Sequence, residues 1–214
     1  MAAGFTLALE AHSLSRLAPI QHVALEVDCL QGRPDVIVTP TPMRSVDPAL
    51  IDALATPSCA LVLSRLKTRG PTDLGALVAS TGLAVRTIER AGSRLCSLGL
   101  CVSRPGGLVA TSAVDEVSAE LWAFELKLRD WRRALYQALQ CRSFAHRAYV
   151  VFPSDREGFI RSKTDTLRAL GVGALSYDPK VQRIRVLVPS RKARPTTLHH
   201  YYYALGRFYG EHVG

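Results

Sequence analysis

An acidic and a basic side chain stand two positions apart in the otherwise apolar stretch at residues 121–128, within a strand expected over 118–128. If this stretch is a β-strand, Glu125 and Lys127 point to one face, and Trp122 is among the apolar side chains of the other. Burying two charges costs free energy unless they are matched or serve chemistry. A sheet whose charged face is merely solvated is the alternative, and the stretch alone leaves both interpretations open.

Further polar residues precede and follow this strand. Asp35, next to Pro34, belongs to an earlier expected strand, and the helix expected after Lys127 carries Gln137. Hard divalent cations prefer oxygen ligands, and Mg²⁺ typically takes one or two carboxylates together with water and substrate phosphate. Asp35 and Glu125 supply two such carboxylates if their strands are neighbours. The pattern therefore predicts a site for Mg²⁺ or Mn²⁺.

Three short motifs in this order resemble the PD-(D/E)xK nuclease superfamily, in particular its RecB-like branch. They are Pro-Asp at 34–35, Glu-Leu-Lys at 125–127 and Gln-Ala-Leu-Gln-Cys at 137–141. The resemblance implies an α/β fold with a restriction-endonuclease-like core, in which helices flank a mixed central sheet. It also implies metal-dependent hydrolysis of phosphodiester bonds.

The same resemblance assigns roles to individual residues. Asp35, Glu125 and the backbone carbonyl of Leu126 are expected to bind the metal. Lys127 is expected to orient or help deprotonate the attacking water and to offset charge on the phosphate. Gln137 completes the catalytic set by steadying the site from its helix.

Two positions stand apart from this motif. Cys141 lies where the RecB-like branch usually has tyrosine. Glu10, on a first helix expected over residues 5–17, matches a position where the family often has an additional acid. A glutamate on the surface of a helix is the alternative interpretation of Glu10.

The distance along the chain between the two carboxylates indicates an insertion. Asp35 and Glu125 are 90 positions apart, too far for strands joined by an ordinary connection. Between them, expected helices at 47–67, 72–79 and 84–98 precede two short strands around Pro105-Gly106-Gly107. That order resembles the winged helix-turn-helix family. We therefore expect a nuclease-like core at 1–43 and 114–214, interrupted by a winged-helix domain at 44–113.

The core segments show alternating and helical apolar patterns of their own. Strands are expected at 22–30, 33–38, 118–128, 147–152, 174–177 and 183–188, and helices at 130–141, 158–170 and 198–212.

Arginines are spaced for contact with nucleic acid in two places. Three recur four positions apart on the expected recognition helix, beside Thr87, and a fourth lies in the wing; these are Arg86, Arg90, Arg94 and Arg104. Three more, Arg129, Arg132 and Arg133, follow the Glu-Leu-Lys motif. Such side chains bind phosphates or guanine edges. Solvated helix faces, or a winged helix that docks protein, are the alternatives.

Composition narrows the class of protein. Lys and Arg outnumber Asp and Glu by 27 to 18, giving a net charge of +9, which favours a polyanion such as DNA as partner. No apolar run reaches the ~18 residues that a membrane span needs, so no membrane partner is expected. The five cysteines form no C-x-x-C pair, and reduced thiols in a cytoplasmic protein are the expectation.

These features together predict a metal-dependent DNA nuclease guided by its own winged helix. The alternative is a DNA-binding or regulatory protein whose nuclease-like domain no longer cuts, an interpretation that Cys141 favours. A homodimer, or a subunit of a larger defence or repair complex, is compatible with either function.

Overall fold

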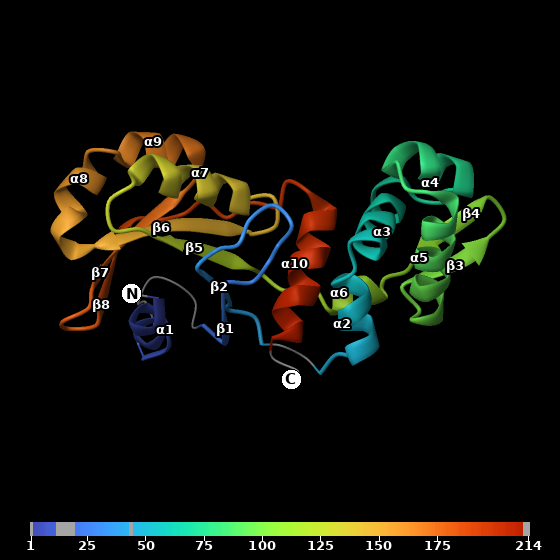
Figure 1. Cartoon of the computed structure of the whole chain (residues 1–214), viewed down its shortest axis with the longest axis horizontal. Helices are drawn as coiled ribbons and strands as arrows, with labels where there is room; N and C mark the ends of the chain where they lie inside the picture. The colour runs from blue at the N-terminus through green and yellow to red at the C-terminus, as the bar shows by residue number, and fades with distance from the viewer. Residues whose placement is uncertain (1, 12–19, 43–44, 212–214) are drawn as a thin grey trace. The chain divides into compact units, whose positions relative to one another are not determined.

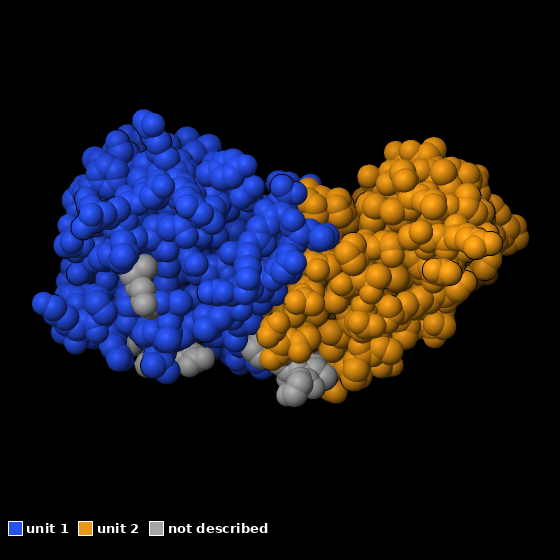
Figure 2. All heavy atoms as spheres, viewed as in Figure 1, with its two compact units in different colours: residues 1–43, 119–196 blue, residues 44–118, 197–214 orange. Residues whose placement is uncertain are grey.

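The computed structural model describes residues 2–11, 20–42 and 45–211. The chain divides into two compact units, each built from two separate stretches of sequence (Figure 2). The first unit comprises residues 1–43 and 119–196, and the second comprises residues 44–118 and 197–214.

The first unit is built on a six-stranded mixed sheet in the order β1-β2-β5-β6-β7-β8. The strands are β1 (His22–Leu25), β2 (Val36–Thr39), β5 (Trp122–Leu126), β6 (Arg147–Pro153), β7 (Gly173–Asp178) and β8 (Arg183–Val188). The central trio β5, β6 and β7 is parallel, and all other neighbours are antiparallel. The expected mixed α/β sheet flanked by helices is confirmed.

Helices cover both faces of this sheet (Figure 1). On one face lie α7 (Trp131–Cys141), α8 (Glu157–Arg161) and α9 (Thr164–Leu170), and a short 3₁₀ turn over Ser154–Arg156 leads into α8. On the other lies α1 (Ala2–Ala11), whose Phe5 ring packs edge-on against Phe124 at 5.7 Å between centroids. The β5 side chains therefore divide as alternation predicts, with Phe124 facing α1 and Glu125 facing α7.

Several expected elements of this unit are shorter than their patterns suggested, among them the strand expected at 118–128, which is β5 at Trp122–Leu126. The strand expected at 22–30 ends at Leu25, because Glu26 and Leu30 have φ values of 50° and 65°, in the left-handed region. The helix expected at 158–170 divides into α8 and α9. At the break, the Ser162 and Thr164 hydroxyls donate to main-chain carbonyls three residues earlier, at 2.7 and 2.8 Å. Such local bonds compete with a continuous helix.

The second unit contains helices and one hairpin. Its elements are α2 (Pro48–Leu54), α3 (Pro57–Arg69), α4 (Leu74–Thr81), α5 (Val85–Ser97), β3 (Cys101–Arg104), β4 (Gly107–Ala110), α6 (Ala113–Glu116) and α10 (Leu198–Gly210). Pro57 separates α2 from α3, since the residue before a proline is disfavoured in helical conformation. Asp73, rather than the expected Thr72, caps α4 by accepting a bond from the Ala76 amide at 2.7 Å.

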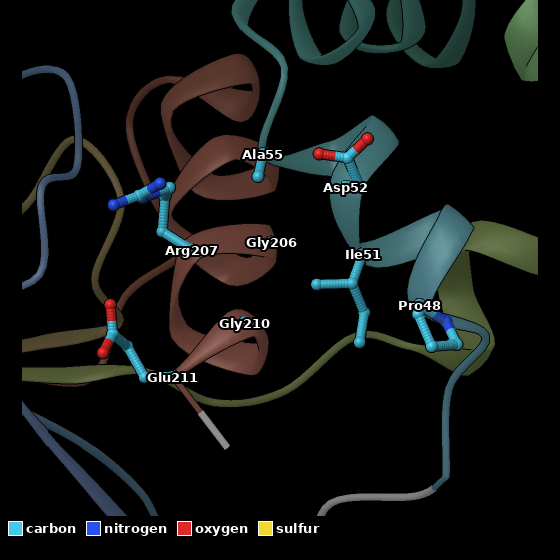
Figure 3. Close-up of a pocket in the computed structure, with 8 residues that line it drawn as sticks. All are labelled: Pro48, Ile51, Asp52, Ala55, Gly206, Arg207, Gly210 and Glu211. Carbon is cyan, nitrogen blue, oxygen red and sulfur yellow. The ribbon is translucent and has the colours of Figure 1, made fainter. Parts of the chain in front are cut away.

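The last helix belongs to the second unit, although residues 198–212 were expected to be part of the core. α10 packs against α2 and α3. Gly206 makes this packing possible, because a Cβ atom there would lie 2.3 Å from the Ala55 amide nitrogen. Figure 3 shows Gly206 on α10 facing Ala55 at the end of α2, beside a pocket of about 390 Å³.

The described residues contain no single helix that is long and apolar enough to cross a membrane. The adjacent helices α2 and α3 reach that length and composition only when taken together, and they are bent by 84° at their break.

Candidate active site

Asp35, Glu125 and Lys127 meet at one end of the strand pair β2–β5. Val36 lies opposite Phe124 in antiparallel register, so Asp35, one residue before β2, falls beside the end of β5. Its Oδ2 atom accepts a hydrogen bond from the Leu126 amide at 2.7 Å and lies 3.4 Å from Lys127 Nζ. Lys127 Nζ is also 3.3 Å from Glu125 Oε2. Residues 90 positions apart in sequence thus form one contact cluster, which we call the acidic centre.

The three side chains of the acidic centre differ in depth. Glu125 is 2% exposed, whereas the side chains of Lys127 and Asp35 are 22% and 31% exposed. Burial raises the pKa of Glu125 to about 7, and the nearby Asp35 carboxylate contributes to the increase, against the opposing effect of Lys127. A positive charge bound here in addition to that of Lys127 would lower the pKa of Glu125 and favour its ionised form near neutral pH.

The donor set fits a hard divalent cation. Asp35 and Glu125 offer carboxylate oxygens, and Leu126 offers a main-chain carbonyl. The Leu126 N–H points toward Asp35, and the N–H and C=O of one strand residue point to the same side, so the carbonyl faces β2 as well. Among the described side chains, no group of three or more His, Cys, Asp or Glu is arranged to hold a metal. The candidate set is therefore two carboxylates and one carbonyl.

Helix α7 lies over the acidic centre and presents Cys141 to it. The Cys141 Sγ atom is 3.9 Å from Glu125 Oε1 and donates toward it. Burial, and secondarily the Glu125 charge, raise the pKa of this thiol well above its usual value, so Cys141 stays protonated. The residue that stands in place of the expected tyrosine thus contacts the buried carboxylate directly.

Gln137 lies one helical turn before Cys141 and shares its face of α7. Its Oε1 atom is buried and has no hydrogen-bond partner among the described residues. Buried polar atoms are nearly always satisfied. The unpaired oxygen on the face that carries Cys141 is consistent with a ligand or water bound near the acidic centre.

The other residues of the first unit that were predicted for the site have no described contact with the acidic centre. Glu10 lies in α1, and its side chain is outside the described residues; α1 packs on the face of the sheet opposite Glu125. Arg129, Arg132 and Arg133 are exposed at the beginning of α7. They are free to face solvent or a polyanion.

The arginine stripe on α5 is shorter than its spacing indicated. Arg86 and Arg90 are exposed and line a shallow hollow of about 470 Å³. Arg94 is half-buried instead, where it forms an ion pair with Asp52 and donates to the Thr56 hydroxyl at 3.3 Å. Arg94 therefore has a structural partner within the unit.

Two other residues predicted for this surface differ in exposure. Thr87 on α5 is half-buried, and Arg104 at the end of β3 is exposed.

A polar pocket of about 220 Å³ at the end of β7 was not predicted from the sequence. Ser176 donates to Glu157 Oε1 at 2.6 Å, and Arg185 Nη1 lies 3.7 Å from the same oxygen. The available signal was the alternation of Arg183 and Arg185 on an expected strand, which places both on one face. Because β5 and β7 run parallel, this pocket and the acidic centre share the carboxyl edge of the sheet.

No protein-family model, curated protein or solved structure matches this chain.

Proposed function

We propose that the chain is a metal-dependent DNA nuclease with a restriction-endonuclease-like core in its first unit and a winged-helix domain in its second. The observation that carries this proposal is the contact of Asp35, Glu125 and Lys127 at the joint end of β2 and β5. Two carboxylates and a lysine, one carboxylate being buried, form a costly arrangement that chemistry would justify.

The reaction is hydrolysis of a phosphodiester. A water oxygen bonds to phosphorus, the bond to one ester oxygen breaks, and that oxygen leaves with a proton as a hydroxyl group. Mg²⁺ or Mn²⁺, held by Asp35, Glu125 and the Leu126 carbonyl, would supply charge stabilisation and an acidified water.

The exposure of the three residues suits different roles in this reaction. Glu125 is fixed at the floor of the site by burial, and Asp35 is fixed by the Leu126 amide. Lys127 is within reach of both carboxylates and remains partly exposed, so its ammonium can turn to a substrate phosphate.

The second unit supports DNA as the substrate. Its helices α3, α4 and α5 and its β3–β4 hairpin follow the order of a winged helix, and α5 carries the exposed Arg86 and Arg90. The net charge of +9 acts in the same direction.

A second candidate is a DNA-binding or regulatory protein that does not cut. Cys141, in the place of the expected tyrosine, and the pairing of Lys127 with both carboxylates favour it. Both candidates share the winged helix and differ in phosphodiester cleavage.

The decisive experiment is cleavage of labelled single- and double-stranded DNA with Mg²⁺, Mn²⁺ or EDTA. Asp35→Asn and Lys127→Met keep side-chain size while removing a charge. Asp155→Asn and Lys180→Met make the same changes at exposed positions of the same unit. We expect metal-dependent cutting by the wild type and by both controls, reduced at least about 100-fold in the two site variants.

Binding is measured on the same samples. DNA binding without cleavage under every metal would refute the nuclease and support the second candidate. Cleavage that persists in Asp35→Asn and Lys127→Met would place the activity elsewhere or in a contaminant.

A further inference from the structure

A pair of cysteines in the second unit lies in direct contact. Cys96, on the last turn of α5, and Cys101, the first residue of β3, have their Sγ atoms 3.0 Å apart. Disulfide sulfurs are separated by about 2.0 Å, so the bond requires a movement of only about 1 Å. Neither residue has a role in the function proposed above.

The two thiols differ in accessibility. All five cysteines lie within the described residues, and among them Cys96 alone is not buried. Its side chain lines a pocket of about 430 Å³ between α4, α5 and the β3–β4 hairpin, together with Leu77 and Leu108. A small oxidant can therefore reach Cys96 without unfolding the unit.

Cys101 is the buried member of the pair. Burial raises the pKa of Cys101 to about 12, and the hydrogen bond with Cys96 and the charge of Cys96 contribute in the same direction. Its thiol also points to the Gly92 carbonyl at 3.7 Å, as a protonated donor does. Cys96 is thus the sulfur that reacts first, and Cys101 is held in place to react second.

We propose that Cys96 and Cys101 form a reversible disulfide when the folded protein meets a hydroperoxide. The Cys96 thiolate attacks a peroxide oxygen, an S–O bond forms, the O–O bond breaks, and hydroxide leaves to become water or, from an organic peroxide, an alkoxide leaves to become an alcohol. The Cys101 sulfur then attacks the Cys96 sulfenic sulfur, the S–S bond forms, and a second water leaves with the Cys101 proton. The two thiols are oxidised and the peroxide is reduced.

The bond links the end of α5 to the beginning of the hairpin. It closes a short loop, which restricts the unfolded chain and stabilises the folded unit. A dithiol reductant reverses it by exchange.

Mass spectrometry on the full chain tests the proposal. The folded protein is treated with hydrogen peroxide, quenched, denatured, alkylated and digested with trypsin. No Lys or Arg stands between Cys96 and Cys101, so both fall in one peptide. We expect that peptide to escape alkylation and to lack two hydrogens, and dithiothreitol to restore both alkylation sites.

Three variants sharpen the result. Cys59→Ser removes a buried thiol of the same unit and is expected to leave the bond intact. Cys96→Ser should leave the Cys101 thiol free, and Cys101→Ser should leave Cys96 as a sulfenic acid that dimedone traps. Wild type should melt several degrees higher oxidised than reduced, and Cys101→Ser should not.

The outcomes are separable from those of the nuclease test, because none requires DNA or metal. A peptide in which dimedone or glutathione labels Cys96 while Cys101 keeps its free thiol would overturn the proposal, and so would a peptide that keeps both free thiols. So would a bond from Cys96 to any cysteine other than Cys101.

Discussion

At the scale of single residues, the buried carboxylate of Glu125 makes a prediction about stability. Its folded pKa is about 7, against 4.5 in an unperturbed chain, because of burial first and Asp35 second. Between these values the folded state binds the proton that the unfolded state has lost, so stability falls as pH rises. For Glu125→Gln without metal, we expect the difference in unfolding free energy from wild type to change by roughly 3 kcal/mol between pH 4.5 and 8, in favour of the variant at the higher pH.

Urea unfolding in EDTA, followed by tryptophan fluorescence, measures this. Both tryptophans, Trp122 and Trp131, lie in the first unit and report on it. If the difference in unfolding free energy between wild type and Glu125→Gln did not change with pH, the raised pKa of Glu125 would be contradicted. Added Mg²⁺ should stabilise wild type more at pH 8 than at pH 5, since a metal binds ionised carboxylates.

Glu120 supplies the matched control with the opposite sign. Burial raises its pKa, but bonds from Lys192 and Trp122 outweigh this and leave the pKa lowered. Its stabilisation is present above the unfolded pKa and is lost as pH falls. Glu120→Gln should therefore be less stable than wild type at neutral pH, and the difference should shrink in acid.

Strand alternation grouped Glu125 with Lys127, and the resemblance of the motif order to a known family added Asp35; the structure brings the three side chains into contact. Partners remote in sequence were not accessible in the same way. Arg94 fits the helical stripe by spacing, yet its bond to Asp52 joins α5 to α2, which is remote in sequence. Spacing places a residue on a face; packing decides what covers that face.

At the scale of elements, the contact between α10 and α2 predicts opposite results for two glycines. A Cβ at Gly206 would lie 2.3 Å from the Ala55 nitrogen and 2.7 Å from the Leu54 carbonyl carbon, both rigid backbone atoms. At Gly210 the nearest atom is Ile51 Cγ2 at 4.0 Å. Alanine stabilises a helix relative to glycine by about 1 kcal/mol. Whether a Gly→Ala substitution raises or lowers the unfolding free energy therefore depends on the space around the new Cβ atom.

We expect Gly206→Ala to lower the unfolding free energy by about 1–3 kcal/mol and Gly210→Ala to leave it unchanged or raise it. Because the tryptophans lie in the other unit, far-UV circular dichroism is the appropriate measurement. Equal effects of the two substitutions would show that α10 does not depend on close approach to α2.

Local sequence patterns predicted most helices and strands. One error has a local cause, a side-chain bond that supports a turn, and another has a tertiary cause, the packing of one helix on another. The strand pattern after Leu25 fails because the Arg33 side chain bonds the Glu26 carbonyl at 2.7 Å and supports a turn there. The apolar face of α10 correctly predicted a packed helix, but periodicity does not say which unit it packs on. That choice depends on Gly206, whose missing side chain matters only opposite α2.

At the scale of the whole molecule, the excess of positive charge predicts salt-dependent binding of DNA. A net charge of +9 attracts any polyanion, so affinity alone does not identify the contact surface. The exposed Arg86 and Arg90 on α5 offer a local test, because each phosphate contact contributes about 0.9 to the slope of log affinity against log salt for duplex DNA.

Arg86→Ala with Arg90→Ala should therefore reduce that slope by about 2 and weaken binding most at low salt. Arg69→Ala with Arg168→Ala lowers the net charge equally at exposed positions on two other helices, α3 and α9, and should leave the slope nearly unchanged. Fluorescence anisotropy over a salt titration distinguishes them. Equal loss in both double variants would mean that total charge, rather than the α5 surface, holds the DNA, and the proposed winged helix would then lose its assigned partner.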